Sequence, residues 1–161
     1  MRSAARSLAA RSRRGEALGM ALDLESLETS FDLIAPRGDE LMDVFYAQLF
    51  AAAPAVKPLF ANTDFRRQKA MLLSALVLVR KKLHDLEAIV PTLHALGARH
   101  VAYGARPEHY PVVGEVLIAS MAEVAGDAWR PEWSRAWAEA LAVVAGAMIE
   151  GAASAEFPQA A

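Results

Sequence analysis

The chain contains no cysteine among its 161 residues. This absence excludes a disulfide framework, a catalytic thiolate, a zinc–thiolate site, an iron–sulfur cluster and a pigment attached through cysteine. Charged residues make up only 22% of the sequence, whereas hydrophobic residues make up 55% and alanine alone fills 35 positions. Such a composition supplies enough apolar surface for a buried core and is not that of a disordered chain. The length favours a single domain.

The sequence also lacks a long hydrophobic run. The longest uninterrupted apolar segment covers residues 140–149 and ends at Glu150, short of the roughly 18 residues that a membrane-spanning helix needs. Motifs for dinucleotide binding, for phosphate-binding loops, for zinc proteases and for serine hydrolases are absent as well. We therefore expect a cytoplasmic domain that does not act at a membrane.

Basic residues are unevenly distributed along the chain. Residues 1–14 contain five arginines and no acidic residue, whereas the part of the chain from Met20 onward contains 12 basic and 18 acidic residues. An acidic body argues against nucleic acid as a partner, because phosphate contacts need clustered Lys and Arg. Residues 1–19 have the composition of an organelle transit peptide, but an upstream extension with Met20 as the true first residue is the simpler interpretation. We expect an extension over 1–19, one folded domain over 20–153 and a tail over 154–161.

From Met20 the chain reads as a series of helices separated by proline and glycine, without the alternating pattern of strands. Thr63 and Asp64 are both candidates for the N-cap of the third long helix. A turn-rich connector covers residues 54–60. The expected helices cover about 23–35, 38–53, 64–83, 86–103, 107–126 and the region from 131 onward. The fold class is therefore all-α, with six or more helices.

Two polar residues lie on faces that an amphipathic helix normally buries. The third expected helix carries an apolar stripe at spacings of three and four residues, and one turn before that stripe lies Gln68. The fourth expected helix carries a similar stripe that ends at His100. Taken alone, each has a structural interpretation, since a histidine on an apolar face is usually a hydrogen-bonded core residue. The glutamine alone is typical of a partly exposed position near a helix start.

Three short motifs give these two residues a context. Phe-Tyr-Ala-Gln-Leu-Phe covers residues 45–50, Pro-Ala-Val-Lys-Pro-Leu-Phe covers 54–60, and His-Tyr-Pro-Val-Val-Gly covers 109–114. Gln68 and His100 lie in that order between the second and third motifs. With this pattern the chain resembles the globins, in particular the bacterial single-domain haemoglobins and the globin domain of flavohaemoglobins. The resemblance covers about residues 22–152.

The resemblance implies a globin fold around one haem b. His100 is similar to the proximal histidine, whose Nε2 binds iron while Nδ1 needs an acceptor that fixes the tautomer. Tyr46 and Gln68 would form the distal polar pair that donates hydrogen bonds to bound dioxygen. The remaining residues for which the resemblance implies cofactor contact are Phe60, Leu72, Tyr110 and Val113. The implied function is reversible binding of dioxygen, nitric oxide and carbon monoxide, with nitric oxide dioxygenation as a secondary activity that needs an external reductase.

One position departs from the flavohaemoglobin pattern. In that pattern a tyrosine, matched here by Tyr110, and a late glutamate polarise the proximal histidine. Counting from Trp137, the place of the glutamate is taken by Ala152. Glu150 lies about 200° round the helix from that position, so it is not a simple replacement. We therefore expect a weakly polarised His100.

The other histidines are weaker candidates as ligands. His84 lies near a helix end, where a cation suits the helix dipole, and His94 lies about 120° round the helix from His100, toward solvent. His109, in the opening turn of the fifth helix, is a candidate neighbour of a haem propionate.

Two alternatives remain open at this stage. A haem-based sensor would signal through a partner, and a helical interaction module would bind no cofactor and would pack Gln68 and His100 shut. The oligomeric state is a monomer or a homodimer.

Overall fold

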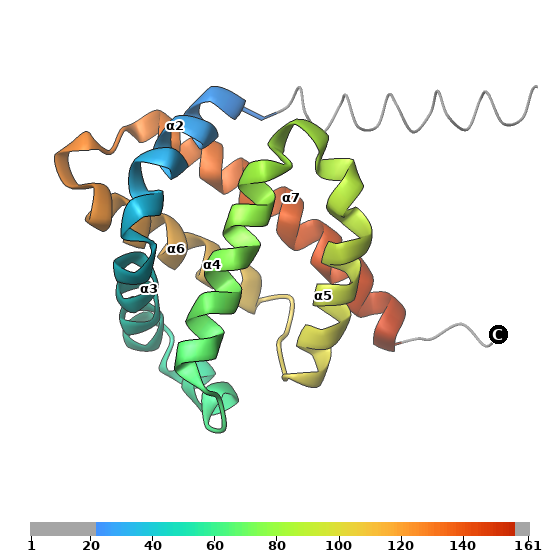
Figure 1. Cartoon of the computed structure of the whole chain (residues 1–161). Helices are drawn as coiled ribbons and strands as arrows, with labels where there is room; N and C mark the ends of the chain where they lie inside the picture. The colour runs from blue at the N-terminus through green and yellow to red at the C-terminus, as the bar shows by residue number, and fades with distance from the viewer. Residues whose placement is uncertain (1–21, 157–161) are drawn as a thin grey trace, which may run out of the picture.

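The computed structural model describes residues 22–156, and within this range every regular element is a helix. The all-α class expected from the sequence is thereby confirmed. The expected extension over 1–19 lies outside the described residues, and so does the end of the expected tail. Six α-helices are present in the described range (Figure 1): α2 Leu24–Ile34, α3 Gly38–Ala52, α4 Phe65–Lys81, α5 Val90–Ala102, α6 His109–Ala125 and α7 Pro131–Glu156. Short 3₁₀ segments connect them: η1 Ala35–Arg37, η2 Pro54–Phe60, η3 Leu83–Ile89 and η4 Gly126–Ala128.

Side-chain caps fix the start of two helices. Asp23 accepts a hydrogen bond from the backbone N–H of Ser26 at 3.1 Å and so begins α2. Of the two candidates for the start of α4, Asp64 is the N-cap, because its carboxylate accepts from the backbone N–H groups of Arg66 and Arg67. Each such cap stabilises a helix by about 1 kcal/mol.

Four features differ from the sequence-based expectation. The expected fourth helix over 86–103 is divided, since η3 occupies Leu83–Ile89, with Asp85 in a non-helical conformation, and α5 begins only at Val90. Pro91 explains this start, because proline fits the first turn of a helix, where its missing N–H removes no bond. Pro107 closes a turn with the N–H of Tyr110 instead of starting α6, which begins at His109. The connector over 54–60 is a 3₁₀ helix, and α7 continues to Glu156, into the expected tail.

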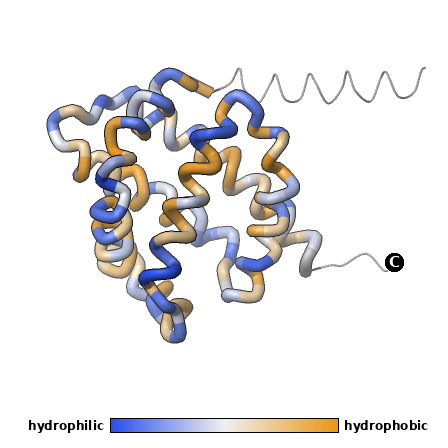
Figure 2. The backbone as a smooth tube through the Cα atoms, viewed as in Figure 1, coloured by the Kyte–Doolittle hydropathy of each residue, from blue (hydrophilic) through white to orange (hydrophobic). Residues whose placement is uncertain are grey.

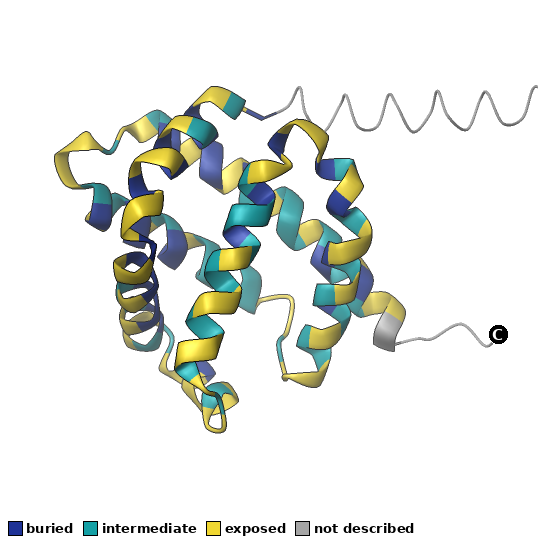
Figure 3. Cartoon of the chain, in the orientation of Figure 1, coloured by how far each residue is buried: buried dark blue, intermediate teal, exposed yellow. Residues whose placement is uncertain are grey.

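The core lies where α2, α3, α6 and α7 face one another, as Figure 3 shows by burial. Trp137 is fully buried at its centre and donates a hydrogen bond from Nε1 to Oγ of Ser30 at 2.8 Å. The Ser30 hydroxyl donates in turn to the carbonyl of Ser26. This chain satisfies the polar atoms of an otherwise apolar core, which would be costly to bury without partners. Other fully buried side chains are Leu27, Ile34, Leu41, Met42, Phe45, Leu83 and Met121.

Helices α5 and α7 make the most extensive contact between two helices in the described chain, and they run side by side in Figure 1. Two buried glycines, one on each helix, allow this approach. A Cβ on Gly97 of α5 would overlap the backbone carbonyl of Met148, and a Cβ on Gly151 of α7 would overlap the backbone of His94. The closeness of these glycines therefore determines the distance between α5 and α7.

By length and composition alone, residues Pro131–Ser154 of α7 could cross a membrane. In this structure α7 packs against α2, α5 and α6 and buries Trp133, Trp137 and Met148, while 28% of the apolar window is buried in all.

Candidate functional site

Tyr46 and Gln68 meet between α3 and α4. Tyr46 is only 5% exposed, and its hydroxyl oxygen accepts a hydrogen bond from Nε2 of Gln68 at 3.1 Å. Burial raises the pKa of Tyr46, and the bond from Gln68 offsets this increase only in part. The phenol therefore keeps its proton at neutral pH. Because Gln68 occupies the oxygen as a donor, the O–H proton is free to be donated to a third group.

An aromatic cluster surrounds Tyr46. The ring of Phe60 lies 5.9 Å from the Tyr46 ring and that of Phe65 lies 5.5 Å from it, both edge to face. Phe50 and Phe60 contact each other at 5.5 Å. These contacts connect η2 and the start of α4 to α3, and they hold the Tyr46 ring in one orientation.

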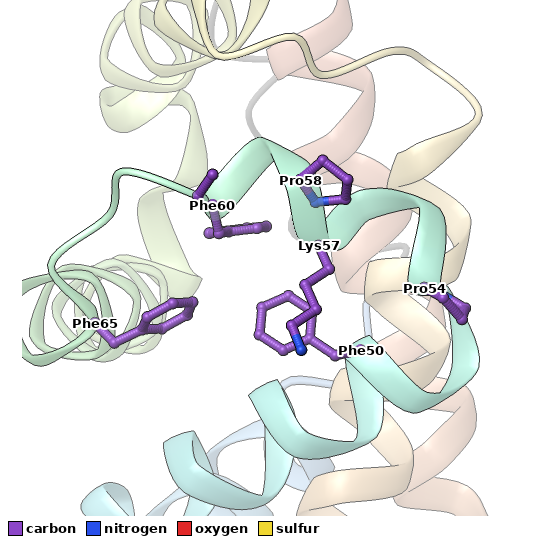
Figure 4. Close-up of a pocket in the computed structure, with 7 residues that line it drawn as sticks. Phe50, Pro54, Lys57, Pro58, Phe60 and Phe65 are labelled. Atoms are coloured by element: carbon purple, nitrogen blue, oxygen red, sulfur yellow. The ribbon is translucent and has the colours of Figure 1, made fainter.

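Three rings of this cluster, Phe50, Phe60 and Phe65, also line a pocket of about 480 Å³. Figure 4 shows Phe50, Phe60 and Phe65 around it, with the Lys57 side chain extending beside Phe50. Its remaining lining residues are Pro54, Pro58 and Ala61. The pocket is therefore mostly apolar, with one cation at its wall.

His100 lies in the last turn of α5. Its Nδ1 lies 2.7 Å from the carbonyl oxygen of Leu96, so Nδ1 carries the proton and Nε2 carries the free lone pair. Burial lowers the pKa of His100, and the nearby charge of Arg99 lowers it further, whereas the bond to Leu96 acts in the opposite direction. The imidazole is thus neutral, with a fixed tautomer. This is the form in which histidine binds a metal.

The four apolar and aromatic residues for which the resemblance implies cofactor contact are half-buried on α4, α6 and η2. Helices α4 and α5 are joined through η3 but scarcely contact each other directly. Leu72 on α4 and Tyr110 and Val113 on α6 stay half-buried, as does Phe60 of η2. Leu72 lies four residues after Gln68 and so shares its helix face. These side chains are available to contact a flat apolar ligand held between the two helices.

No three His, Asp or Glu side chains converge as a metal site within residues 22–156. A metal bound through His100 would therefore need most of its ligands from elsewhere, as an iron in a porphyrin has. The single neutral imidazole, the half-buried apolar residues and the buried Tyr46–Gln68 pair fit a haem. Within residues 22–156 no hydrogen bond joins His100 to Tyr46 or Gln68, so the candidate site consists of two separate polar groups.

The groups expected to polarise His100 are not joined by hydrogen bonds within residues 22–156. Glu150, the nearest acid in sequence to Ala152, lies 3.3 Å from Nε2 of His94, so its carboxylate faces α5 at that position. Burial raises the pKa of Tyr110. The Tyr110 hydroxyl makes no hydrogen bond to another side chain within residues 22–156, and the methyl group of Ala152 cannot make one.

The structure also places the remaining histidines. His84 in η3 pairs with Glu28 at 2.5 Å. The side chain of His94 is 42% exposed, as expected for a position toward solvent, and it contacts Glu150. Nδ1 of His109 accepts a hydrogen bond from the backbone N–H of Arg106 at 3.0 Å, which orders the turn before α6. Each of these three has a structural partner.

Sequence reasoning missed two features of the site. The interior glycine of α5, Gly97, was not singled out, whereas it allows the close approach of α5, which carries His100, to α7. Tyr103 was not singled out, yet its ring lies 5.6 Å from the His100 ring. A glycine inside an apolar helix face was the available signal for the first. The spacing of three residues from His100 was the signal for the second.

Comparison with known proteins agrees with this geometry. The sequence profile of the globin family matches residues 43–148. A flavohemoprotein of Bacillus thuringiensis is 34% identical over 128 residues, which cover 78% of this chain and 31% of the relative. A flavohemoprotein of Bacillus subtilis is 29% identical over 128 residues, covering 78% of this chain and 32% of the relative. The chain thus spans about a third of the length of the curated relatives it matches.

Solved structures show the same fold. A bacterial globin from Campylobacter jejuni aligns with a TM-score of 0.71 and 24% identity, over 81% of this chain and 94% of that one. A flavohemoglobin from Malassezia yamatoensis, determined with bound FAD and heme, aligns with a TM-score of 0.61 and 21% identity, over 80% of this chain and 36% of that one. The fold and the sequence profile lead to the same conclusion: the chain belongs to the globin family.

Proposed function

We propose that this globin binds one haem b between α4 and α5, with His100 as the protein ligand of the iron, and that it reversibly binds dioxygen, nitric oxide and carbon monoxide. The observation that carries the proposal is the Nδ1 bond from His100 to Leu96, which leaves Nε2 free on a neutral ring. The haem would supply an iron centre that takes up diatomic gases. Phe60 and Leu72 would pack against the porphyrin, and Tyr110 and Val113 would complete its apolar surroundings.

Tyr46 and Gln68 would act on the gas ligand. Gln68 holds the Tyr46 oxygen, so the phenolic proton points away from the amide and can be donated to a ligand. Dioxygen in haem proteins draws negative charge onto itself, and a hydrogen bond to such a charged acceptor stabilises it by about 1–3 kcal/mol. Carbon monoxide draws much less charge. The pair therefore favours dioxygen over carbon monoxide.

Nitric oxide dioxygenation is the second candidate, favoured by the similarity to flavohemoproteins. This activity consumes reducing equivalents, so it would depend on an electron donor outside residues 22–156. Glu150 is paired with His94 and does not hydrogen-bond to Tyr110. His100 would then be a weakly polarised ligand, which favours storage or transfer of the gas over its activation.

An absorption spectrum of the purified protein tests the proposal. We expect a Soret band in the oxidised form, a changed spectrum after reduction with dithionite, and a further shift with carbon monoxide. A protein that purifies without haem and takes up none when haem is added would refute the proposal and favour an interaction module without a cofactor.

A further inference from the structure

One end of the molecule brings together segments that are distant in sequence. Phe60 of η2 stacks on Phe65 of α4 with ring centres 5.9 Å apart. A Cβ placed on Gly104, in the connection after α5, would lie 3.0 Å from Cδ2 of Leu59. The end of α5 and the connection to α6 therefore lie against η2 and the start of α4, at the lower end of the molecule in Figure 1.

This end is basic, although the chain as a whole is acidic. Residues 54–67 and 99–109 contain five basic residues and two acidic ones, Asp64 and Glu108. Figure 2 shows the hydrophilic first turn of α4. The basic residues are all exposed and take part in no salt bridge within the described chain: Lys57, Arg66, Arg67, Arg99 and Arg106. The Asp64 carboxylate is occupied in capping α4, so it compensates these charges only in part.

Two exposed apolar side chains lie among these charges. Leu59 is 41% exposed and Tyr103 is 57% exposed, and they are two of the four large hydrophobic residues that the described chain leaves exposed. They are close in space, because Leu59 lies against Gly104, the neighbour of Tyr103. An apolar centre with a charged rim is the usual anatomy of a protein-binding surface. We call Leu59, Tyr103 and the five basic residues the basic end.

Tyr103 connects this surface to the proposed site. Its ring lies 5.6 Å from the His100 ring at an angle of 64°. A partner that covers Tyr103 is therefore separated from His100, the proposed iron ligand, only by the Tyr103 ring.

We propose that the basic end is the docking surface for a separate electron-donor protein with an acidic face. This inference rests on the proposed function. One electron would leave the reduced cofactor of the donor, which is oxidised, and the haem iron would pass from the ferric to the ferrous state, with no proton or atom transferred. Charge complementarity selects the partner, because an acidic protein is attracted to this end and repelled by the rest of the chain. Such contacts are small, transient and sensitive to salt.

Binding of an acidic flavodoxin to the protein as purified tests the proposal, measured by isothermal titration calorimetry. We expect binding that weakens at least tenfold when salt rises from about 0.05 M to about 0.5 M, because the Debye length then falls by about a factor of three. The double variant Lys57→Glu/Arg106→Glu should raise the Kd at least tenfold. The matched control Lys81→Glu/Lys82→Glu alters the net charge equally at the far end of α4 and should change the Kd less than twofold.

Tyr103 is tested separately. Tyr103→Ser should weaken flavodoxin binding, and Tyr103→Phe should restore it, because the ring supplies the apolar contact. Absence of binding to the unaltered protein, or equal weakening by both charge-reversal variants, would overturn the docking proposal. A missing Soret band in a sample that binds flavodoxin as expected would instead refute the haem proposal and leave the docking surface intact.

Discussion

The buried glycine of α5 gives a prediction whose sign is set by geometry. In Gly97→Ala the new methyl group meets the backbone carbonyl of Met148, and a backbone atom cannot rotate away as a side chain can. Either α5 or α7 must shift. Overpacking of this kind costs about 1–3 kcal/mol, whereas the higher helix propensity of alanine returns at most about 1 kcal/mol. We therefore expect Gly97→Ala to lower the free energy of unfolding by about 1–2 kcal/mol.

Gly146 of α7 provides the matched control. It is exposed, and a Cβ at this position would meet nothing within 4 Å. Gly146→Ala should raise the free energy of unfolding by about 0.5–1 kcal/mol, since only helix propensity changes. Urea unfolding of both variants, compared at equal m-values, measures the two effects. If Gly97→Ala is as stable as the unaltered protein, the claim that α5 and α7 are in backbone contact at Gly97 is contradicted.

Three further predictions concern the site and the caps. Tyr46→Phe and Gln68→Leu should each raise the dissociation rate of dioxygen about tenfold, as expected for a bond of ~1.4 kcal/mol. Flash photolysis should show a much smaller change for carbon monoxide. Haem should raise the melting temperature by about 10 °C, because a ligand present at about a thousand times its Kd stabilises the folded state by ~4 kcal/mol; equal melting temperatures of the haem-free and haem-loaded protein would contradict this. The hydrogen bonds from the side chain and backbone of Ser26 lower the pKa of Asp23 below its ordinary value of 3.8. The stability that this cap contributes is therefore fully present above the ordinary pKa and is lost as the pH falls through the lower pKa of the folded state. Asp23→Ala should thus destabilise by about 1 kcal/mol at neutral pH, and acid titration followed by circular dichroism should show this difference disappearing below the ordinary pKa.

Much of the fold could be predicted from local chemistry. The spacing of apolar residues predicted the apolar stripe of α4, on which Leu76 and Val79 are buried. The N-cap of α4 was reduced to two adjacent residues. The division of the expected fourth helix was not predicted, since Asp85, the non-helical residue in η3, is neither proline nor glycine. Tertiary contacts decide such positions.

The site was predictable only as far as residue type and order are informative. The Tyr46–Gln68 pair links residues 22 positions apart, and their hydrogen bond depends on how α3 crosses α4. The partner of Glu150 could not be found from sequence, because it lies 56 residues away on α5. Tyr103 gained its place beside His100 from the turn at the end of α5. Each of these contacts depends on how the helices pack. The sequence pattern predicts that the fold is all-α, but it does not predict which residues of different helices meet.

The assignment of His100 as the iron ligand is tested most directly by the absorption spectrum of His100→Ala. The account predicts that this variant loses haem during purification and recovers a Soret band when free imidazole is added with haem. His94→Ala and His109→Ala remove imidazoles that are held by Glu150 and by the turn before α6, and both should keep the spectrum of the unaltered protein. A normal Soret band in His100→Ala without added imidazole would contradict the account.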